Sequence, residues 1–203
     1  MSNIKRLIHE LKHHTPFTAI ASITSIIITL AIIYLFKSTI NPEAFHSLHL
    51  LHLLASSFVS AAVFYKYKKN IFQATFVGVV SAILIGSISD IIFPWIGGQI
   101  LSLHTSFHLP LLEIPLIVIG TSILGSLLGI WLKRTRLPHF IHVFISAFAS
   151  LFYILAFSSN FSILFIIISI IIVFLAGIIP CCISDILMPF FFLKQDIKHC
   201  NCH

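Results

Sequence analysis

Long apolar stretches, separated only by short polar connections, dominate this chain. Hydrophobic residues make up 58% of its 203 residues and charged residues only 9%, far from the balance of a soluble domain. A helix of about 20 apolar residues crosses a hydrocarbon core about 30 Å thick, and six stretches meet that requirement. They lie at residues 17–36, 47–65, 71–93, 110–132, 139–158 and 162–190. The sequence therefore predicts an all-α integral membrane protein with six transmembrane helices.

Lysine and arginine are distributed unevenly between the two sides of this predicted topology. Of the 12 basic residues, only Lys37 falls on one side, and all the others flank helix ends that share the opposite side. Cytoplasmic loops carry the excess of positive charge, so both termini are predicted to face the cytoplasm. The expected location is the inner cell membrane, as a multi-pass protein. Because topology accounts for the net charge of +6, no nucleic-acid partner is expected.

The two halves of the chain share motifs in the same order. His-x-x-x-Ser-x-Phe-x-Ser begins at His52 and again at His142, and Ser-Asp-Ile-(Ile/Leu)-x-Pro surrounds Asp90 and Asp185. Each half contains three predicted spans, so the second copy enters the membrane from the opposite side. Many secondary transporters are built from such inverted repeats. The predicted organisation is a basic amphipathic segment at 1–16, repeats at 17–98 and 99–193, an outer loop at 99–109 within the second repeat, and a cytoplasmic tail at 194–203.

Histidines and carboxylates gather at the predicted outer ends of the helices. Three histidines of the second span are spaced by three residues and so share one helix face. Two more are four residues apart, as two ligands on one helical turn would be, and a glutamate follows inside the fourth span. Imidazole and carboxylate are ligands that zinc, nickel, cobalt, iron and manganese share. The predicted outer metal ligands are His46, His49, His52, Asp90, His104, His108 and Glu113.

A second group of ligand types is predicted at the cytoplasmic side. It includes two adjacent cysteines one helical turn before an aspartate, and thiols stay reduced in that compartment. The tail packs four soft ligands into His-Cys-Asn-Cys-His, which suits a thiophilic ion held as an acceptor or sensor outside the transport route. The predicted inner ligands are His139, His142, Cys181, Cys182, Asp185, His199, Cys200, Cys202 and His203.

Ligands at both faces of an inverted repeat indicate a transporter or facilitator for a transition-metal ion, with zinc as the first candidate and no catalytic residue. Two alternatives stay open. An intramembrane zinc-dependent hydrolase acting on a lipid would need one complete site on one side. A haem-binding membrane protein would need paired histidines at one depth, whereas His52 and His142 are predicted at opposite depths. The expected partners are the lipid bilayer and the metal ion; a homodimer is left open because no interface motif decides it.

Overall fold

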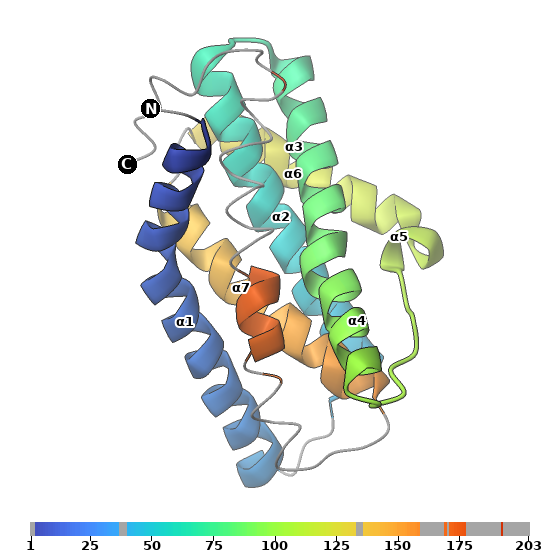
Figure 1. Ribbon diagram of the computed structural model, residues 1–203. Coiled ribbons are helices and arrows are strands. Elements are labelled where there is room, and N and C mark those ends of the chain that lie inside the picture. Colours follow the sequence, from blue (N-terminus) through green and yellow to red (C-terminus); the bar gives the residue numbers. More distant parts are fainter. Residues whose placement is uncertain are drawn as a thin grey trace.

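The computed structural model describes residues 3–36, 40–132, 136–158, 169, 171–177 and 192. Within these ranges the regular structure is entirely helical, and no strand occurs (Figure 1). The elements are α1 (Asn3–Phe36), α2 (Pro42–Tyr67), α3 (Ile71–Ser87), the π-helical turn η1 (Ile88–Ile92), α4 (Phe93–Ile100), α5 (Pro110–Glu113), α6 (Pro115–Leu132) and α7 (Arg136–Phe157).

Three helical stretches of the described chain are long and apolar enough to cross a membrane. They are Pro42–Tyr67, Ile71–Ile100 and Pro115–Leu132, while Ala19–Ile33 and Ile141–Phe157 are shorter apolar helices. Large apolar side chains such as Phe72, Leu116 and Trp131 are more than 70% exposed on their outer faces. A face of this kind suits contact with lipid. The predicted all-helical class is confirmed for the described residues. The six spans and the inverted repeat stay predictions, and most of the sixth predicted span lies outside the described residues.

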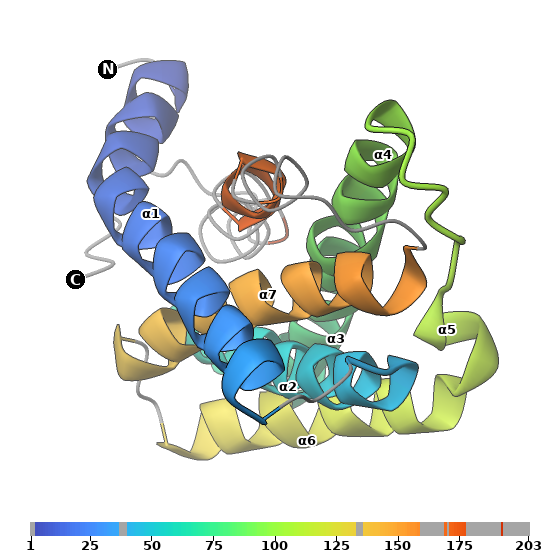
Figure 2. The ribbon, with the colours of Figure 1, turned by 90° about the horizontal axis from the view of Figure 1, so that it is seen from below.

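Helix α2 lies at the centre of the described bundle, between α6 and α7 and in contact with α3 (Figure 2). Its contact with α6 is close because Gly125 and Gly129 of α6 lie against the main chain of α2. A Cβ atom at either glycine would collide with a carbonyl oxygen, that of Leu54 or that of Phe58. Small residues allow membrane helices to approach in this way. Polar side chains carried by α2 are therefore enclosed by neighbouring helices.

The helix that carries Asp90 continues past Pro94, although the predicted span ends at residue 93. Proline has no N–H to bond the carbonyl of Asp90, four residues earlier, and its ring crowds that carbonyl. The chain accommodates Pro94 through η1, in which the N–H of Phe93 bonds the carbonyl of Ile88. The helical stretch then runs on to Ile100. Asp90 consequently lies about 15 Å inside the helix end, at 1.5 Å per residue, and its predicted position near that end is wrong.

The predicted span at 110–132 is divided into two helices. Pro110 begins the single turn α5 and Pro115 begins α6, with Ile114 in a non-helical conformation between them. Proline suits both starts because the first N–H groups of a helix have no partner inside it. Glu113 belongs to the short turn, and its side chain is 44% exposed. Its predicted place inside the fourth span is therefore wrong.

Candidate metal sites

Three ligand side chains from separate segments meet near the start of α2. His46 comes from α2, His108 from the extended segment before α5, and Glu113 from the end of α5. The Nε2 atoms of the two histidines are 2.7 Å apart, and Nδ1 of His108 lies 2.7 Å from Oε1 of Glu113. One ligand atom of each residue lies within 4.8 Å of the others, so this outer group can hold a metal ion.

The outer group has to open slightly to take an ion. Two zinc–nitrogen bonds of 2.0–2.1 Å at a tetrahedral angle separate their nitrogens by about 3.3 Å, so the rings of His46 and His108 must part by roughly 0.6 Å. Both rings are partly exposed, and that of His108 stacks on Phe157 with centroids 4.5 Å apart. A ring held by stacking can slide in its own plane, so this arrangement allows the two rings to part by that distance.

Helix α7 holds the segment that presents His108. The hydroxyl oxygen of Tyr153 accepts the His108 N–H and donates its hydrogen to the carbonyl of Ser106, both at 3.1 Å. The Ser106 N–H in turn donates to the carbonyl of Phe157 at 3.1 Å. Sequence reasoning missed Tyr153 and Phe157. The available signal was Tyr153 itself, because a tyrosine within an apolar helix usually has a hydrogen-bond partner for its hydroxyl.

A second group lies deeper and is almost completely buried. His49 and His52 direct Nδ1 toward one oxygen of Asp90, Oδ2, at 2.8 and 2.7 Å. The hydroxyls of Ser89 and Ser146 donate to the other oxygen, Oδ1, at 2.8 and 3.1 Å. All five residues are at most 2% exposed. We call His49, His52 and Asp90 the central group.

The central group lies near mid-length of its helices. His52 is ten residues from Pro42, the first residue of α2, which corresponds to about 15 Å. Asp90 is equally far from the end of its own helix at Ile100. Half of a hydrocarbon core about 30 Å thick is the same distance. His52 and Asp90 therefore lie well inside their helices, while their place at the outer face and metal ligation by them stay predictions.

His142 of α7 lies level with the central group. Its ring is fully buried and stacks on that of His52, with centroids 5.5 Å apart and planes 5° from parallel. The expectation that these two histidines occupy opposite depths is wrong. Ser146 and Ser150 follow His142 at intervals of four and so share its helix face. Ser146 bonds Asp90, and Ser150 donates to the Ser89 carbonyl at 3.1 Å; the repeated motif contained this signal, although it was not used for the site.

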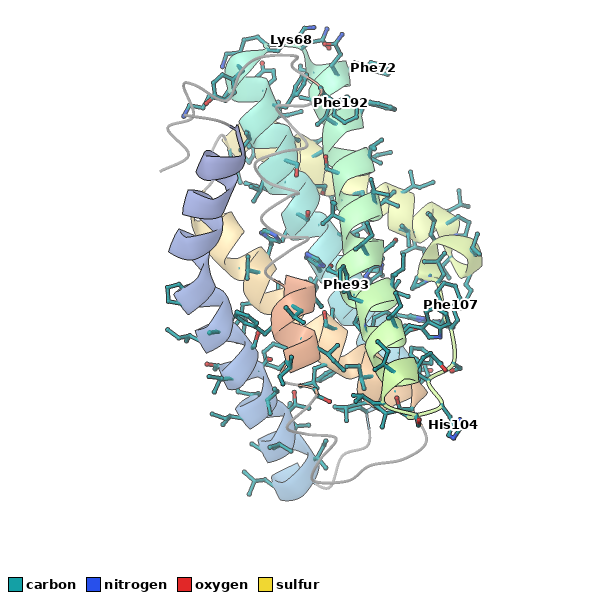
Figure 3. All side chains as sticks on the ribbon, in the orientation of Figure 1. Lys68, Phe72, Phe93, His104, Phe107 and Phe192 are labelled. Carbon is teal, nitrogen blue, oxygen red and sulfur yellow. The ribbon has the colours of Figure 1, made fainter. Side chains whose placement is uncertain are left out.

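Other predicted ligands are not brought to either group. His104 is exposed in a non-helical segment and has a positive φ of 49°, so it does not share a helical turn with His108. Figure 3 shows His104 at the end of the molecule opposite Lys68. His139 belongs to α7, but its side chain is outside the described part. The remaining predicted ligands also lie outside the described residues: Cys181, Cys182, Asp185, His199, Cys200, Cys202 and His203.

The charge of the central group favours a cation. Within the described chain, imidazoles and hydroxyls surround the Asp90 carboxylate, and no lysine or arginine bonds it. A carboxylate buried at membrane depth is costly unless positive charge balances it.

No protein-family model, curated protein or solved structure matches the chain. The function therefore has to be inferred from the outer and central groups themselves.

Proposed function

We propose that the protein binds a transition-metal ion and carries it across the membrane, with zinc as the first candidate. One observation carries the proposal: a single face of α2 contributes histidines to two ligand groups at successive depths. His46 joins the outer group about 6 Å from the start of α2, and His52 joins the central group about 15 Å from it. Two sites in line give an ion a place to enter and a place to stop within the membrane.

The ligand types define the class of ion. Neutral imidazole suits zinc, copper, iron and nickel, whereas sites for calcium and magnesium are built from oxygen atoms. Each group adds one carboxylate, Glu113 in the outer group and Asp90 in the central group, so both favour cations over anions. The described groups therefore suit a divalent transition metal better than a hard cation or an anion.

Polar side chains continue beyond the central group toward the other end of the bundle. Ser56 and Ser60 follow His52 along the same face of α2, and both are buried. The hydroxyls of Ser60 and of Ser81 on α3 have no hydrogen-bond partner among the described residues. An ion that moves needs several moderate sites that it can leave, so hydroxyls beyond the histidines suit passage.

The stacking of His52 on His142 supports the inverted repeat. These histidines are corresponding members of the repeated motif, and their contact puts matching positions of the two halves side by side, as a two-fold relation between the halves allows. Transporters with inverted repeats place their substrate site near the bilayer midplane, where the repeats meet. The central group has this position if His52 and His142 lie on either side of the pseudo-two-fold axis.

Cellular metal content tests the proposed transport. Cells that express the protein should gain or lose zinc relative to cells that express the His52→Ala variant at the same membrane level. The matched control is Ser47→Ala, because Ser47 is exposed on α2 and belongs to neither group. Equal zinc, cobalt, nickel, copper, iron and manganese contents with the wild-type protein and with His52→Ala would overturn the proposal.

A lipid hydrolase is the second candidate, favoured by the level position of His142. Three histidines, Asp90 and two serines gather at one depth, and catalytic zinc is commonly held by three protein ligands that leave one position open. A hydrolase has no need of the outer group. His108→Ala should therefore spare lipid turnover if the protein is a hydrolase, and should impair metal transport if it is a transporter.

Haem binding is disfavoured, because axial histidines approach the iron from opposite sides, whereas His52 and His142 stack face to face.

A further inference from the structure

The two oxygens of Asp90 serve different partners. Oδ2 meets Nδ1 of both His49 and His52, and Oδ1 receives the hydroxyls of Ser89 and Ser146. Ser150 adds a bond to the Ser89 carbonyl, which fixes the main chain next to the carboxylate. Four side-chain contacts thus hold Asp90 in one orientation, with both oxygens already engaged.

This arrangement determines which imidazole nitrogen can bind an ion. An ionised carboxylate only accepts hydrogen bonds, so both Nδ1 atoms facing Asp90 carry hydrogen. In a neutral imidazole the other nitrogen, Nε2, then has a free electron pair. Histidines that bind metal nearly always donate their second ring N–H to a carboxylate, carbonyl or water in this manner.

We propose that the central group is a second metal site, in which His49 and His52 bind through Nε2 and Asp90 is a positioning residue rather than a ligand. The inference rests on the proposed metal-binding function and deepens it. The two histidines are three residues apart and share one helix face. The ligand atoms of the central group do not converge within 4.8 Å as those of the outer group do, so the rings have to turn before both can bind one ion. A divalent cation on their Nε2 side would also balance the carboxylate behind them.

The outer group repeats the same chemistry in a more exposed place. Nδ1 of His108 faces the Glu113 carboxylate, and its Nε2 faces His46. In both groups a carboxylate occupies the Nδ1 side of a histidine. In the outer group this arrangement accompanies three ligand atoms that lie within 4.8 Å of one another. We therefore interpret Asp90 as part of a metal site rather than as a solely structural residue.

Cobalt(II) titration of the purified full-length protein, followed by visible absorption, tests the second site. His52→Ala and His108→Ala should each lose one bound cobalt ion per chain, and the double variant should lose two. Asp90→Ala should weaken one cobalt site by 10- to 100-fold, the usual effect of removing a carboxylate that holds a metal-binding histidine. Thermal unfolding of each variant monitors its folding.

Asp90→Asn is the decisive variant, because it separates positioning from ligation. The asparagine oxygen can accept both Nδ1 hydrogens, and its NH₂ group can donate to the two serine hydroxyls. The positioning role therefore predicts the wild-type shape of the cobalt spectrum and an affinity loss smaller than that of Asp90→Ala. Ser146→Ala, which leaves both histidine bonds in place, should reduce affinity least and serves if Asp90→Ala fails to fold.

Two results would overturn the inference. If the His49→Ala, His52→Ala double variant binds as much cobalt as the wild type, the second site does not exist. If Asp90→Asn loses the ion or alters its spectrum as His52→Ala does, Asp90 is a ligand. Failure of transport is distinguishable from both, because a protein that binds two ions in these groups without moving zinc would refute only the proposed transport.

Discussion

Carboxylates orient three of the imidazoles in the outer and central groups. In His49, His52 and His108 the Nδ1 atom faces a carboxylate, and in His108 the Nε2 atom faces a second imidazole. Residues outside the ligand set maintain this orientation. Tyr153 holds the backbone of His108 in the outer group, and Ser146 holds Asp90 in the central group.

Tyr153→Phe should weaken metal binding at the outer group without affecting the central group. The change removes the hydroxyl that bonds Ser106 and His108, and each such bond contributes about 0.5–1.5 kcal/mol. We expect an affinity loss on the order of five- to tenfold at the outer group, measured by cobalt titration. Tyr65→Phe, near the opposite end of α2, is the matched control. Equal affinities in both variants would show that Tyr153 does not position His108.

At the scale of helices, close packing and one local irregularity place the polar groups. Gly125 and Gly129 bring α6 against α2, and η1 places Asp90 against the histidines of α2. The π-helical turn directly precedes Phe93 and Pro94, and we infer that it accommodates the proline and so influences the position of Asp90. Single π-helical turns within α-helices are frequently found at functional sites.

Pro94→Ala should impair the central group while leaving the fold at least as stable. Alanine supplies an N–H for the Asp90 carbonyl, so the turn can relax toward an α-helix and rotate Asp90 away from His49 and His52. We expect at least a tenfold loss of cobalt affinity at the central group, with a midpoint of thermal unfolding that is unchanged or higher. Pro42→Ala, at the exposed start of α2, is the control. Wild-type affinity in folded Pro94→Ala would refute the role assigned to η1.

Gly129→Val should destabilise the contact between α2 and α6. The Cβ atom would meet the carbonyl oxygen of Phe58, and neither main chain can move without separating the helices. Overpacking of this kind costs about 1–3 kcal/mol or more, so the variant should unfold at lower temperature. Gly120→Ala is a matched control on the same helix, because a Cβ atom there has nothing within 4 Å. A similar midpoint for both variants would contradict the packing described.

Hydropathy predicts the apolar helices well because a helix in lipid must satisfy its backbone internally and present apolar side chains. The stretches at 47–65 and 71–93 accordingly lie within helices of the structure. Depth was predicted less well, because Pro94 suggested a helix end and only the π-helical turn lets the helix continue. The pairing of His52 with His142 depends on how α2 and α7 cross, and a single sequence does not contain that information.

At the scale of the whole molecule, the described helices have two distinct ends. Figure 3 shows Lys68 at one end and His104 at the other, so the basic residues after α2 and the loop before α5 are separated by the length of the bundle. Positive charge favours the cytoplasmic side. In the orientation proposed here, the outer group faces outward and lies between the outside and the central group.

Reporter fusions test this orientation. Fusions after Lys69, after Arg136 and at the carboxyl end should report the cytoplasm, and fusions near Glu43 and Ser102 should report the outside. The reason is the excess of positive charge near the first set of positions, since Lys37 is the only lysine or arginine on the side of the second set. A common side for the fusions at 102 and 136 would remove the odd-numbered crossing on which the inverted repeat depends.

Zinc flux into vesicles that contain only the purified protein tests the central claim most directly. Vesicles with an entrapped fluorescent zinc indicator should fill faster with the wild-type protein than without protein. His108→Ala should slow the flux, and the His49→Ala, His52→Ala double variant should reduce it to the protein-free rate. Flux of wild-type size in that double variant, or zinc entry no faster than in empty vesicles for the wild-type protein, would contradict the account.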